Sequence, residues 1–352
     1  MLAPDLDLPA LGELLAAAHV VRLPLRMRFR ALVQREAVLL KGPAGWGEFA
    51  PFVEYDDVEA ARWLASAIES AWLGHPVPIR AAVPVNATVP AVAAQDVPDV
   101  LARFPGCTTV KVKVAERRPF SERRPRAGRR IDNDVERVAA VRDVLGPAGR
   151  IRVDANGAWD VESAAVGIAR LARYGLEYVE QPCATVGELR ELRLLLARRG
   201  LDVRIAADES VRKAEDPLRV AVAGAADVVV VKVAPLGGVR AALEVARRLG
   251  DEHGLPVVVS SALDTSVGIA AGVALAAALP DLPYACGLAT AALLAKDVCT
   301  DPLGPCGGVV PVRAAVPDPA LLTALAAPPD SATWWRERLA RCRAVLAGSM
   351  RA

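Results

Sequence analysis

The first 79 residues and the rest of the chain differ in how apolar and polar positions alternate. Residues 20–53 alternate with a period of two and are interrupted by turn residues, which predicts an antiparallel meander. Apolar residues then recur at i, i+3, i+4 and i+7 and predict a helix over residues 58–72. We therefore expect a small α+β unit over residues 1–79.

From residue 80 onward, short apolar runs alternate with helical patterns rich in Ala, Leu and Arg. Eight such strand-and-helix units over residues 80–301 predict an α/β fold of the (β/α)8, TIM-like class. The alternative is an open doubly wound sheet, but no G-x-G-x-x-G pattern follows the first strand. Residues 302–352 end in a predicted helix, and we expect this C-terminal segment to return to the N-terminal unit, which would cap the barrel.

Composition indicates a globular protein, because 53% of the 352 residues are hydrophobic. A net charge of +2 gives no bulk attraction to nucleic acid or to an anionic membrane. The longest apolar run, residues 267–279, is too short to span a bilayer, so we expect no membrane insertion. The N-terminus lacks the basic start of a signal peptide, and the six cysteines lack CxxC spacing. These features predict a cytoplasmic protein with reduced thiols.

Residues 115–130 break the pattern, because they hold seven arginines and two glutamates. We expect a solvated insertion between the second barrel strand and its helix. The alternative is a patch for nucleic acid or another anion, but Phe120 is the only aromatic residue there that could stack on a base.

Two lysines, Lys111 and Lys113, interrupt the β-branched run 108–114. Positions i and i+2 of a strand share a face, so both ammonium groups are predicted to point into the barrel. A buried lysine is costly unless it is paired or its pKa falls. Only six of the 43 basic residues are lysines. Because Lys can lose its proton near neutral pH and Arg cannot, the pair indicates acid–base chemistry.

Polar side chains end the next predicted strands at steps of 24 to 28 residues, about one strand-and-helix unit each. The active sites of such barrels lie at the C-terminal ends of the strands. In chain order these residues are Asp154 (with Asn156 on its face), Glu180, Asp208, Lys232, Ser260 and Ser261. Three carboxylates on adjacent strands form an oxygen cage that suits Mg²⁺ or Mn²⁺, with lysines on either side.

Each residue also has a plainer interpretation. Asp154 alone could be the N-cap of the following helix, and Lys111 could be a structural partner of a barrel carboxylate. Glu209 competes with Asp208 for the metal, although Asp208 is favoured because it shares a face with Ala206. We favour one shared site because all these groups recur at the spacing of one barrel unit.

The set suits removal of a proton α to a carboxylate. The resulting enolate dianion is very unstable in water, and a divalent ion offsets its charge. A lysine in an apolar barrel, close to a metal ion and to a second lysine, has a lowered pKa and can act as the base. A lysine on the opposite face can stabilise the enolate or deliver a proton.

The motifs Lys-x-Lys, Asp-x-Asn, Glu-Gln-Pro and Asp-Glu-Ser, with the strand-six lysine, resemble the muconate-lactonizing-enzyme-like branch of the enolase superfamily. The stretches GPAGWGEFAPF, VKVAPLGGV and VSSALDTSVG are similar to the o-succinylbenzoate synthase family of menaquinone biosynthesis, in its actinobacterial form. The resemblance covers nearly the whole chain. It implies a Mg²⁺-dependent lyase that dehydrates 2-succinyl-6-hydroxy-2,4-cyclohexadiene-1-carboxylate to o-succinylbenzoate.

The resemblance also implies roles by position. The implied metal ligands are Asp154, Glu180 and Asp208. Lys113 would take the α-proton and return it to the departing hydroxyl, and Lys232 would stabilise the enolate from the other face. Arg152 matches a family arginine close to the site, and Ser260 and Ser261 are placed for the succinyl carboxylate. Cap segments 26–30 and 52–55 would close over this small carboxylate substrate.

Two other functions stay open. The same lysines could racemise N-succinylamino acids or epimerise dipeptides, although CGLATAALLAKDV lacks the acidic D-x-D motif that dipeptide epimerases share near strand eight. A barrel without catalytic activity that binds anions or nucleic acid through residues 115–130 is the third hypothesis.

Overall fold

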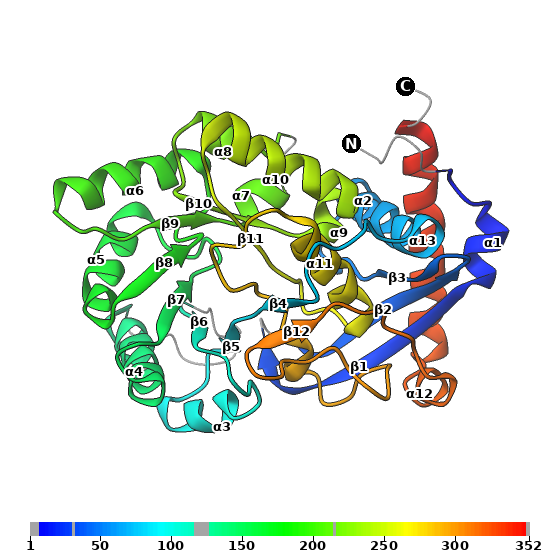
Figure 1. Cartoon of the computed structure of the whole chain (residues 1–352), viewed down its shortest axis with the longest axis horizontal. Coiled ribbons are helices and arrows are strands. Elements are labelled where there is room, and N and C mark those ends of the chain that lie inside the picture. The colour runs from blue at the N-terminus through cyan, green and yellow to red at the C-terminus, as the bar shows by residue number, and fades with distance from the viewer. Residues whose placement is uncertain (1–6, 30–31, 116–126, 214–215, 350–352) are drawn as a thin grey trace.

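The structure is a computed structural model that describes the chain apart from residues 1–6, 30–31, 116–126, 214–215 and 350–352. An N-terminal cap lies beside a barrel, and the C-terminal helix packs on the cap (Figure 1). Most of the predicted 115–130 insertion lies outside the described residues. Its last residues, 127–130, belong to a helix rather than to an insertion, which corrects that prediction.

The cap is built on an antiparallel sheet of order β1-β2-β3, which confirms the predicted meander. Its strands are β1 (Ala18–Phe29), β2 (Leu32–Gly42) and β3 (Gly45–Phe49). The predicted helix is α2 (Asp57–Ile68), which starts where the Asp56 side chain accepts a hydrogen bond from the Glu59 N–H. It continues as a π-helical turn, η1 (Glu69–Leu73), and a short helix α1 (Leu11–Ala16) precedes the sheet.

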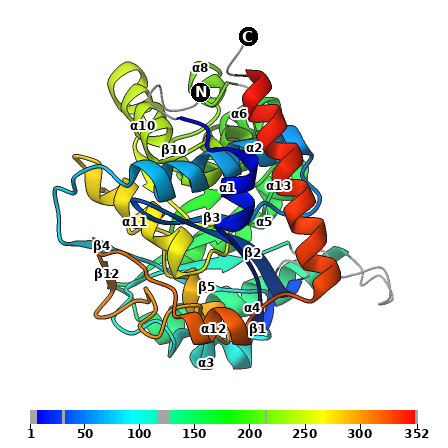
Figure 2. The same cartoon turned by 90° about the vertical axis from the view of Figure 1, so that its right-hand side faces the viewer.

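The C-terminal helix α13 (Pro329–Ser349) completes the core of the cap, running across α2 and the β-sheet (Figure 2). Trp335 is buried, and its ring meets that of Phe49 edge to face with 5.9 Å between centroids. Its indole N–H donates to Glu36 at 2.8 Å, so the polar edge of this large side chain is also satisfied. The predicted return of the C-terminal segment to the cap is therefore confirmed.

The barrel has seven parallel strands in the order β11-β10-β9-β8-β7-β6-β5. They are β5 (Ala87–Val89), β6 (Thr109–Lys113), β7 (Arg150–Asp154), β8 (Leu176–Glu180), β9 (Ile205–Ala207), β10 (Val228–Val231) and β11 (Val257–Val259). Two residues fill the eighth position: Cys286 bridges to Val85 and Gly287 bridges to Ser260. The sheet thus closes, which confirms the predicted class, with the eighth strand reduced to two residues.

Helices cover the outside of the barrel (Figure 1). They are α3 (Val97–Leu101), α4 (Ala127–Leu145), α5 (Val161–Leu171), α6 (Val186–Arg198), α8 (Arg219–Val222), α10 (Val239–His253) and α11 (Ser266–Ala278). Short elements complete the fold: η2 (Ala94–Asp96), η3 (Ala172–Tyr174), α7 (Glu209–Arg212), α9 (Val233–Leu236), η4 (Thr290–Leu293), α12 (Pro319–Ala324) and the antiparallel pair β4 (Ala82–Pro84) and β12 (Val309–Pro311).

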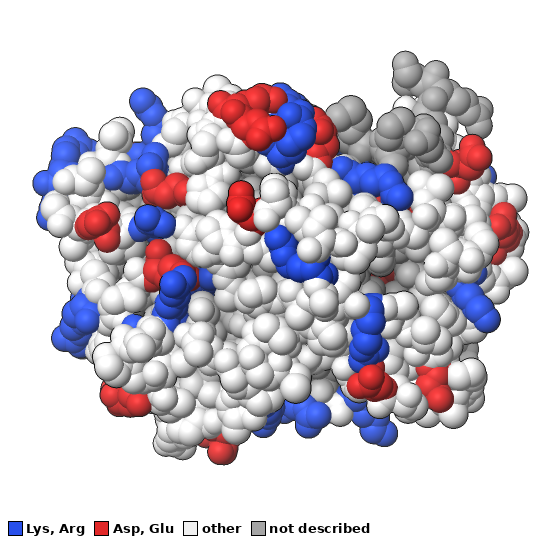
Figure 3. Space-filling model, viewed as in Figure 1, with Lys and Arg blue, Asp and Glu red and all other residues white. Residues whose placement is uncertain are grey.

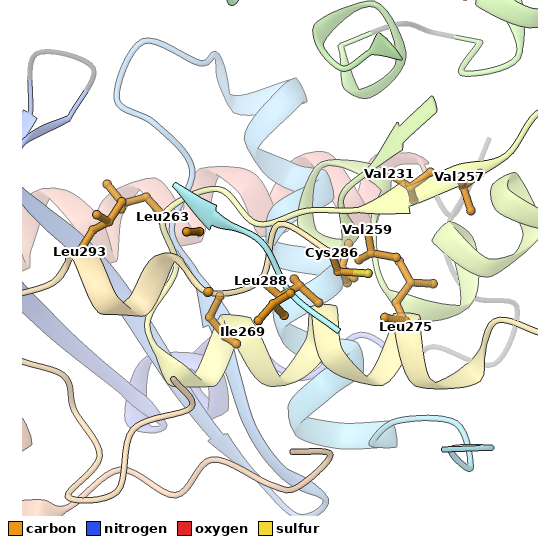
Figure 4. Close-up of a cluster of buried hydrophobic side chains, with 14 of the residues drawn as sticks. Val231, Val257, Val259, Leu263, Ile269, Leu275, Cys286, Leu288 and Leu293 are labelled. Carbon is orange, nitrogen blue, oxygen red and sulfur yellow. The ribbon is translucent and has the colours of Figure 1, made fainter. Parts of the chain in front are cut away.

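The apolar run 267–279 forms most of α11, whose residues are buried almost all round. Figure 4 shows Ile269 and Leu275 of this helix beside Leu288 and Cys286 of the barrel. The cap strand β3 contacts the same helix, so α11 lies between two hydrophobic surfaces. A helix that is apolar on every face is expected in such a position.

No helix in the described part of the chain is both long enough and apolar enough to cross a membrane. On the face seen in Figure 3, acidic and basic side chains are interspersed and much of the surface is uncharged.

Two buried acids of the cap reach the first turns of barrel helices. Glu48 of β3 accepts hydrogen bonds from the backbone N–H groups of Thr265 and Gly268, at the start of α11. Glu69 accepts from the backbone N–H of Arg240, at the start of α10. Because the first N–H groups of a helix lack intrahelical partners, these carboxyl groups satisfy them and fasten the cap to the barrel.

The stability of the fold should depend on pH through Glu48. Burial and the neighbouring Asp264 raise the pKa of Glu48 from 4.5 to about 8, although Arg35 opposes the shift. The folded chain therefore holds a proton that the unfolded chain releases. The stabilisation is fully present below about pH 4.5 and is lost as the pH rises through about 8.

We expect the free energy of unfolding, measured by urea denaturation between pH 5 and pH 9, to fall with pH more steeply in the wild type than in Glu48→Gln. The amide cannot ionise, so this part of the slope disappears. Parallel pH profiles for the two proteins would contradict the assignment.

Candidate active site

Cross-strand pairing arranges the predicted site residues in two rows on the inner face of the barrel. The upper row, at the strand ends, consists of Lys113, Asp154 and Glu180. The lower row consists of Lys111, Arg152 and Tyr178. Tyr178 belongs to a small cluster with Tyr284 and Val230. Because alternate residues of a strand share a face, both rows point into the barrel. The charged groups of the upper row therefore lie on the same inner face as the cluster that contains Tyr178.

Lys113 lies against the first of the acids. Its ammonium group hydrogen bonds to Asp154 and donates to Oδ1 of Asn156 at 2.9 Å. It also stands 5.5 Å from the ring centroid of Phe29 in the cap. Asp154 is not the N-cap of the next helix, since Asp160 caps α5, and that interpretation is wrong. The structure thus brings the predicted base and the first predicted ligand together.

Lys111 reaches up from the lower row to Glu180. Its Nζ lies 2.9 and 3.0 Å from the two carboxylate oxygens of Glu180 and 3.8 Å from Asp154. Burial alone would lower the pKa of Lys111, but the charges of Glu180 and Asp154 outweigh it and raise the pKa. Burial and Asp154 also raise the pKa of Glu180, to about 7. Lys111 is therefore a structural partner of a barrel carboxylate, as its plainer interpretation held.

Asp208 and Glu209 have different surroundings. Asp208 is fully buried and accepts from Nζ of Lys232 at 2.6 Å and from Nε of Arg212 at 3.2 Å. Burial opposes its ionisation, but Lys232 and Arg212 hold the pKa of Asp208 well below its usual range. Glu209 instead binds Arg212 at 2.8 Å and Asn156 at 3.3 Å. Of the two acids, Asp208 is the one paired with the second predicted catalytic lysine.

Gln181 is a residue of the site that sequence reasoning did not single out. It is fully buried, and its side-chain oxygen accepts from the backbone N–H groups of Asp208 at 2.9 Å and Ser210 at 3.2 Å. Its amide group donates to the carbonyl of Cys183 at 2.8 Å. Gln181 thereby orients the start of the segment that carries Asp208. The only signal in the sequence was its place in the Glu-Gln-Pro motif.

Arg212 was also missed, and it joins the site to the cap. Besides Asp208 and Glu209, its guanidinium donates to the hydroxyl of Tyr55 at 2.6 Å. Tyr55 belongs to the cap segment 52–55, which was predicted to lie over the substrate. The contact spans 157 residues of sequence, so no local pattern could predict it.

Arg152 lies one layer below the acids rather than among them. It is fully buried, pairs with Glu177, and donates to Asn86 at 3.0 Å and to the carbonyl of Ala285 at 2.7 Å. Its guanidinium also stands 4.7 Å from the ring centroid of Tyr178. These contacts tie the lower parts of several barrel strands together.

The two predicted serines border a pocket at the mouth of the barrel. Ser260 is buried, and the Ser261 hydroxyl hydrogen bonds to the carbonyl of Gly287 and to Thr290, both at 2.7 Å. The pocket is also lined by Phe29, Phe52, Lys113, Asp154 and Lys232. The cap therefore closes one side of the pocket, while residue 30, the last of the predicted segment 26–30, lies outside the described residues.

The acids do not form a ready-made metal cluster. Within the described ranges, no three His, Cys, Asp or Glu side chains are spaced to hold a metal ion as they stand. Instead, Asp154, Glu180 and Asp208 each face an ammonium group. The donor set is nevertheless one of buried carboxylates on three neighbouring strands, which is the oxygen chemistry that Mg²⁺ prefers.

The capped barrel with acids at its strand ends defines a class of protein. A family model for the enolase C-terminal domain-like fold matches residues 91–317, and one for the enolase N-terminal domain-like fold matches residues 20–71. The chain belongs to the enolase superfamily. The solved structure of muconate lactonizing enzyme from Pseudomonas putida aligns with a TM-score of 0.69 at 21% identity, covering 88% of this chain and 98% of that one, and shares the fold.

Nearer relatives narrow the assignment. The o-succinylbenzoate synthase of Thermobifida fusca is 58% identical over 92% of this chain and 94% of its own length. The o-succinylbenzoate synthase of Mycolicibacterium smegmatis is 54% identical over 96% of this chain and 98% of its own length. Within the superfamily, the chain belongs to the o-succinylbenzoate synthases.

Replacement of Gln181 should weaken the segment that carries Asp208. In Gln181→Ala the buried N–H of Asp208 loses its acceptor, which typically costs about 1–3 kcal/mol. We expect a lower free energy of unfolding, measured by urea denaturation. Ser210→Ala, which removes only a hydroxyl partner of Gln181, is the matched control and should have a smaller effect. Equal stability of Gln181→Ala and the wild type would contradict this role.

Proposed function

We propose that this enzyme dehydrates 2-succinyl-6-hydroxy-2,4-cyclohexadiene-1-carboxylate to o-succinylbenzoate, a step of menaquinone biosynthesis, by removal of an α-proton. It is a carbon–oxygen lyase. The observation that carries the mechanism is that Lys113 and Lys232 line the same pocket. Strands β6 and β10 are four positions apart in a barrel of eight, so lysines at their ends approach a bound substrate from its two faces.

The proposed metal ligands are Asp154, Glu180 and Asp208, and the proposed ion is Mg²⁺, with Mn²⁺ as an alternative. A bound divalent ion would offset the charge that develops on the substrate carboxylate. The acids fit such an ion by chemistry, because each is a buried carboxylate at a neighbouring strand end. Binding requires the ammonium groups of Lys113 and Lys232 to turn from these acids toward the pocket.

Lys113 is the proposed base. The C–H bond α to the carboxylate breaks, its proton moves to Nζ of Lys113, and the electron pair stays on the substrate as an enolate. The enolate electron pair then forms the new ring double bond as the C–O bond to the ring hydroxyl breaks, and the same proton leaves with that oxygen as water, so atoms and charge balance. Asn156, which accepts a hydrogen bond from Lys113 at 2.9 Å, keeps the ammonium group aimed at this edge of the pocket.

Lys232 is the proposed electrostatic partner on the other face. Its ammonium group, which lies 2.6 Å from Asp208 in the structure, would turn from that acid and approach the enolate from β10. Ser260 and Ser261 are proposed to receive the succinyl carboxylate, because they border the same pocket next to Lys232. Lys111 is proposed to keep its hydrogen bonds to Glu180 and to contribute only its positive charge to the site. Arg152 supports the barrel beneath these groups.

Racemisation of N-succinylamino acids is the second reaction that two opposed lysines allow. The likeness to the solved N-succinyl Arg/Lys racemase of Bacillus cereus, at 17% identity and a TM-score of 0.69, concerns the fold alone. Relatives at 53–58% identity favour the dehydratase. Turnover of the cyclohexadiene substrate and of an N-succinylamino acid distinguishes the two reactions.

Purified enzyme with Mg²⁺ should convert the cyclohexadiene substrate to the aromatic product, which is followed by its ultraviolet absorbance. Removal of divalent ions with EDTA should abolish turnover, and added Mg²⁺ should restore it, because the carboxylates cannot by themselves offset the charge of the enolate. No aromatic product, together with racemisation of an N-succinylamino acid, would replace the proposal with its alternative.

Loss of either lysine should stop the reaction without unfolding the barrel. We expect Lys113→Ala to lower kcat by about 10²–10⁴-fold, as for a lost general base. Lys232→Ala should lower it by about 10²–10³-fold, as for lost electrostatic stabilisation. Circular dichroism checks the fold, and Lys41→Ala, on a cap strand away from the pocket, is the control. Wild-type kcat in either catalytic variant would refute its assigned role.

A further inference from the structure

A buried arginine of the cap contacts two walls of the pocket. Arg35 of β2 is only 4% exposed, and its Nε donates to the carbonyl of Leu263 at 3.3 Å. Its Nη2 hydrogen bonds to the carbonyl of Ala50, and its guanidinium stands 4.5 Å from the ring centroid of Phe52. Phe52 and Leu263 both line the pocket. Arg35 therefore links the cap segment around residue 50 to the barrel loop after β11.

Glu48 of the neighbouring strand β3 holds the same loop slightly further along. Its carboxyl group accepts from the backbone N–H groups of Thr265 at 3.1 Å and Gly268 at 3.0 Å, and from the Thr265 hydroxyl. A Cβ at Gly268 would lie 3.0 Å from the carboxyl carbon of Glu48, so the contact is closely packed. Glu48 thus secures the C-terminal end of the loop at the start of α11.

The loop that leads into these two contacts, residues 260–263, forms part of the wall of the pocket. Ser260, Ser261 and Leu263 all border the pocket, which Lys113 also lines. Leu263 has a φ of +65°, which is a costly backbone conformation for a residue with a branched side chain. Such a conformation persists only where the surroundings impose it. Arg35 on its carbonyl and Glu48 two residues later supply that constraint, and Figure 4 shows Leu263 beside the start of α11.

We propose that Arg35 and Glu48 are positioning residues through which the cap sets the shape of the pocket wall formed by residues 260–263. Neither residue lines the pocket that Lys113 and Asp154 share. Glu48 borders only the adjoining pocket, beside Lys232, Ser260 and Ser261, so the proposed action of both residues is through the loop that they hold. This inference rests on the proposed dehydratase function. It predicts an effect on substrate binding, and hence on KM, that exceeds the effect on kcat.

Glu69 offers a matched control. It is also a buried acid of the cap, and it holds the start of α10 through the backbone N–H of Arg240 at 3.1 Å and the Arg240 guanidinium at 2.8 Å. Unlike Glu48, it does not hold a segment that contributes serines or Leu263 to the pocket. Comparison of Glu48 with Glu69 separates positioning of the pocket wall from attachment of the cap in general.

The experiment measures kcat, KM and melting temperature for Glu48→Ala, Glu48→Gln, Arg35→Lys and Glu69→Ala with the cyclohexadiene substrate. We expect Glu48→Ala to raise KM by about tenfold, as loss of one or two hydrogen bonds implies, with a smaller change in kcat. Glu48→Gln, which keeps an acceptor oxygen, should recover most of the loss. Arg35→Lys should raise KM because Lys lacks the planar fork of Arg. Glu69→Ala should lower the melting temperature and leave KM unchanged.

Amide hydrogen exchange over residues 260–268 gives a second readout that does not need turnover. We expect faster exchange there in Glu48→Ala, or in Glu48→Gln and Arg35→Lys if the alanine variant does not fold, and wild-type exchange in Glu69→Ala. Unchanged exchange and KM in the Glu48 and Arg35 variants would overturn the inference, and so would an equal rise of KM in Glu69→Ala. If the variants change exchange over residues 260–268 as expected but the wild type makes no aromatic product, the positioning role stands and the proposed function is overturned instead.

Discussion

Everything at the mouth of the barrel depends on compensating three buried carboxylates. Removing an ionised acid from water costs several kcal/mol unless an opposite charge and hydrogen bonds replace the solvent. Asp154, Glu180 and Asp208 meet this requirement through Lys113, Lys111 and Lys232, with Arg212 as a second partner of Asp208. The strand register that aligns Lys113, Asp154 and Glu180 is therefore also the register that makes their burial tolerable.

Pairing with lysines also leaves these carboxylates able to change partners. An acid whose counter-ion is a flexible lysine can exchange that partner for a metal ion, whereas an acid paired only with a fixed arginine cannot do so as readily. Three of the six lysines of the chain, Lys111, Lys113 and Lys232, pair with these acids. Arg152 illustrates the contrast, because its contacts with Glu177 and Asn86 lie one layer below Asp154 and Glu180.

Repetition along the chain made the barrel and the row of acids predictable. Asp154 and Glu180 are 26 residues apart, which is one strand-and-helix unit, and the register places them opposite each other. Periodicity shows which face of a strand a residue shares, but not how far down the barrel its side chain makes contacts. The sequence therefore could not show that Arg152, on the same face as Asp154, belongs to the layer below the acids. Nor does it give contacts between the cap and the barrel: Glu48 and its partner Thr265 are 217 residues apart. The eighth strand was visible as an apolar stretch, but its reduction to Cys286 and Gly287 depends on tertiary closure.

The cap is therefore more than a cover. Arg212 binds Asp208 and, through the same guanidinium, the hydroxyl of Tyr55, so the cap segment above the pocket and a carboxylate within it share one cation. Any shift of Tyr55 changes how far Arg212 neutralises Asp208, and any cation that binds Asp208 weakens the hold of Arg212 on it. The position of the cap and the charge of the site are thus linked through the hydrogen bonds that Arg212 donates to Tyr55 and to Asp208. A barrel that must bury its acids and still admit a substrate gains from a cap that contacts the same charges.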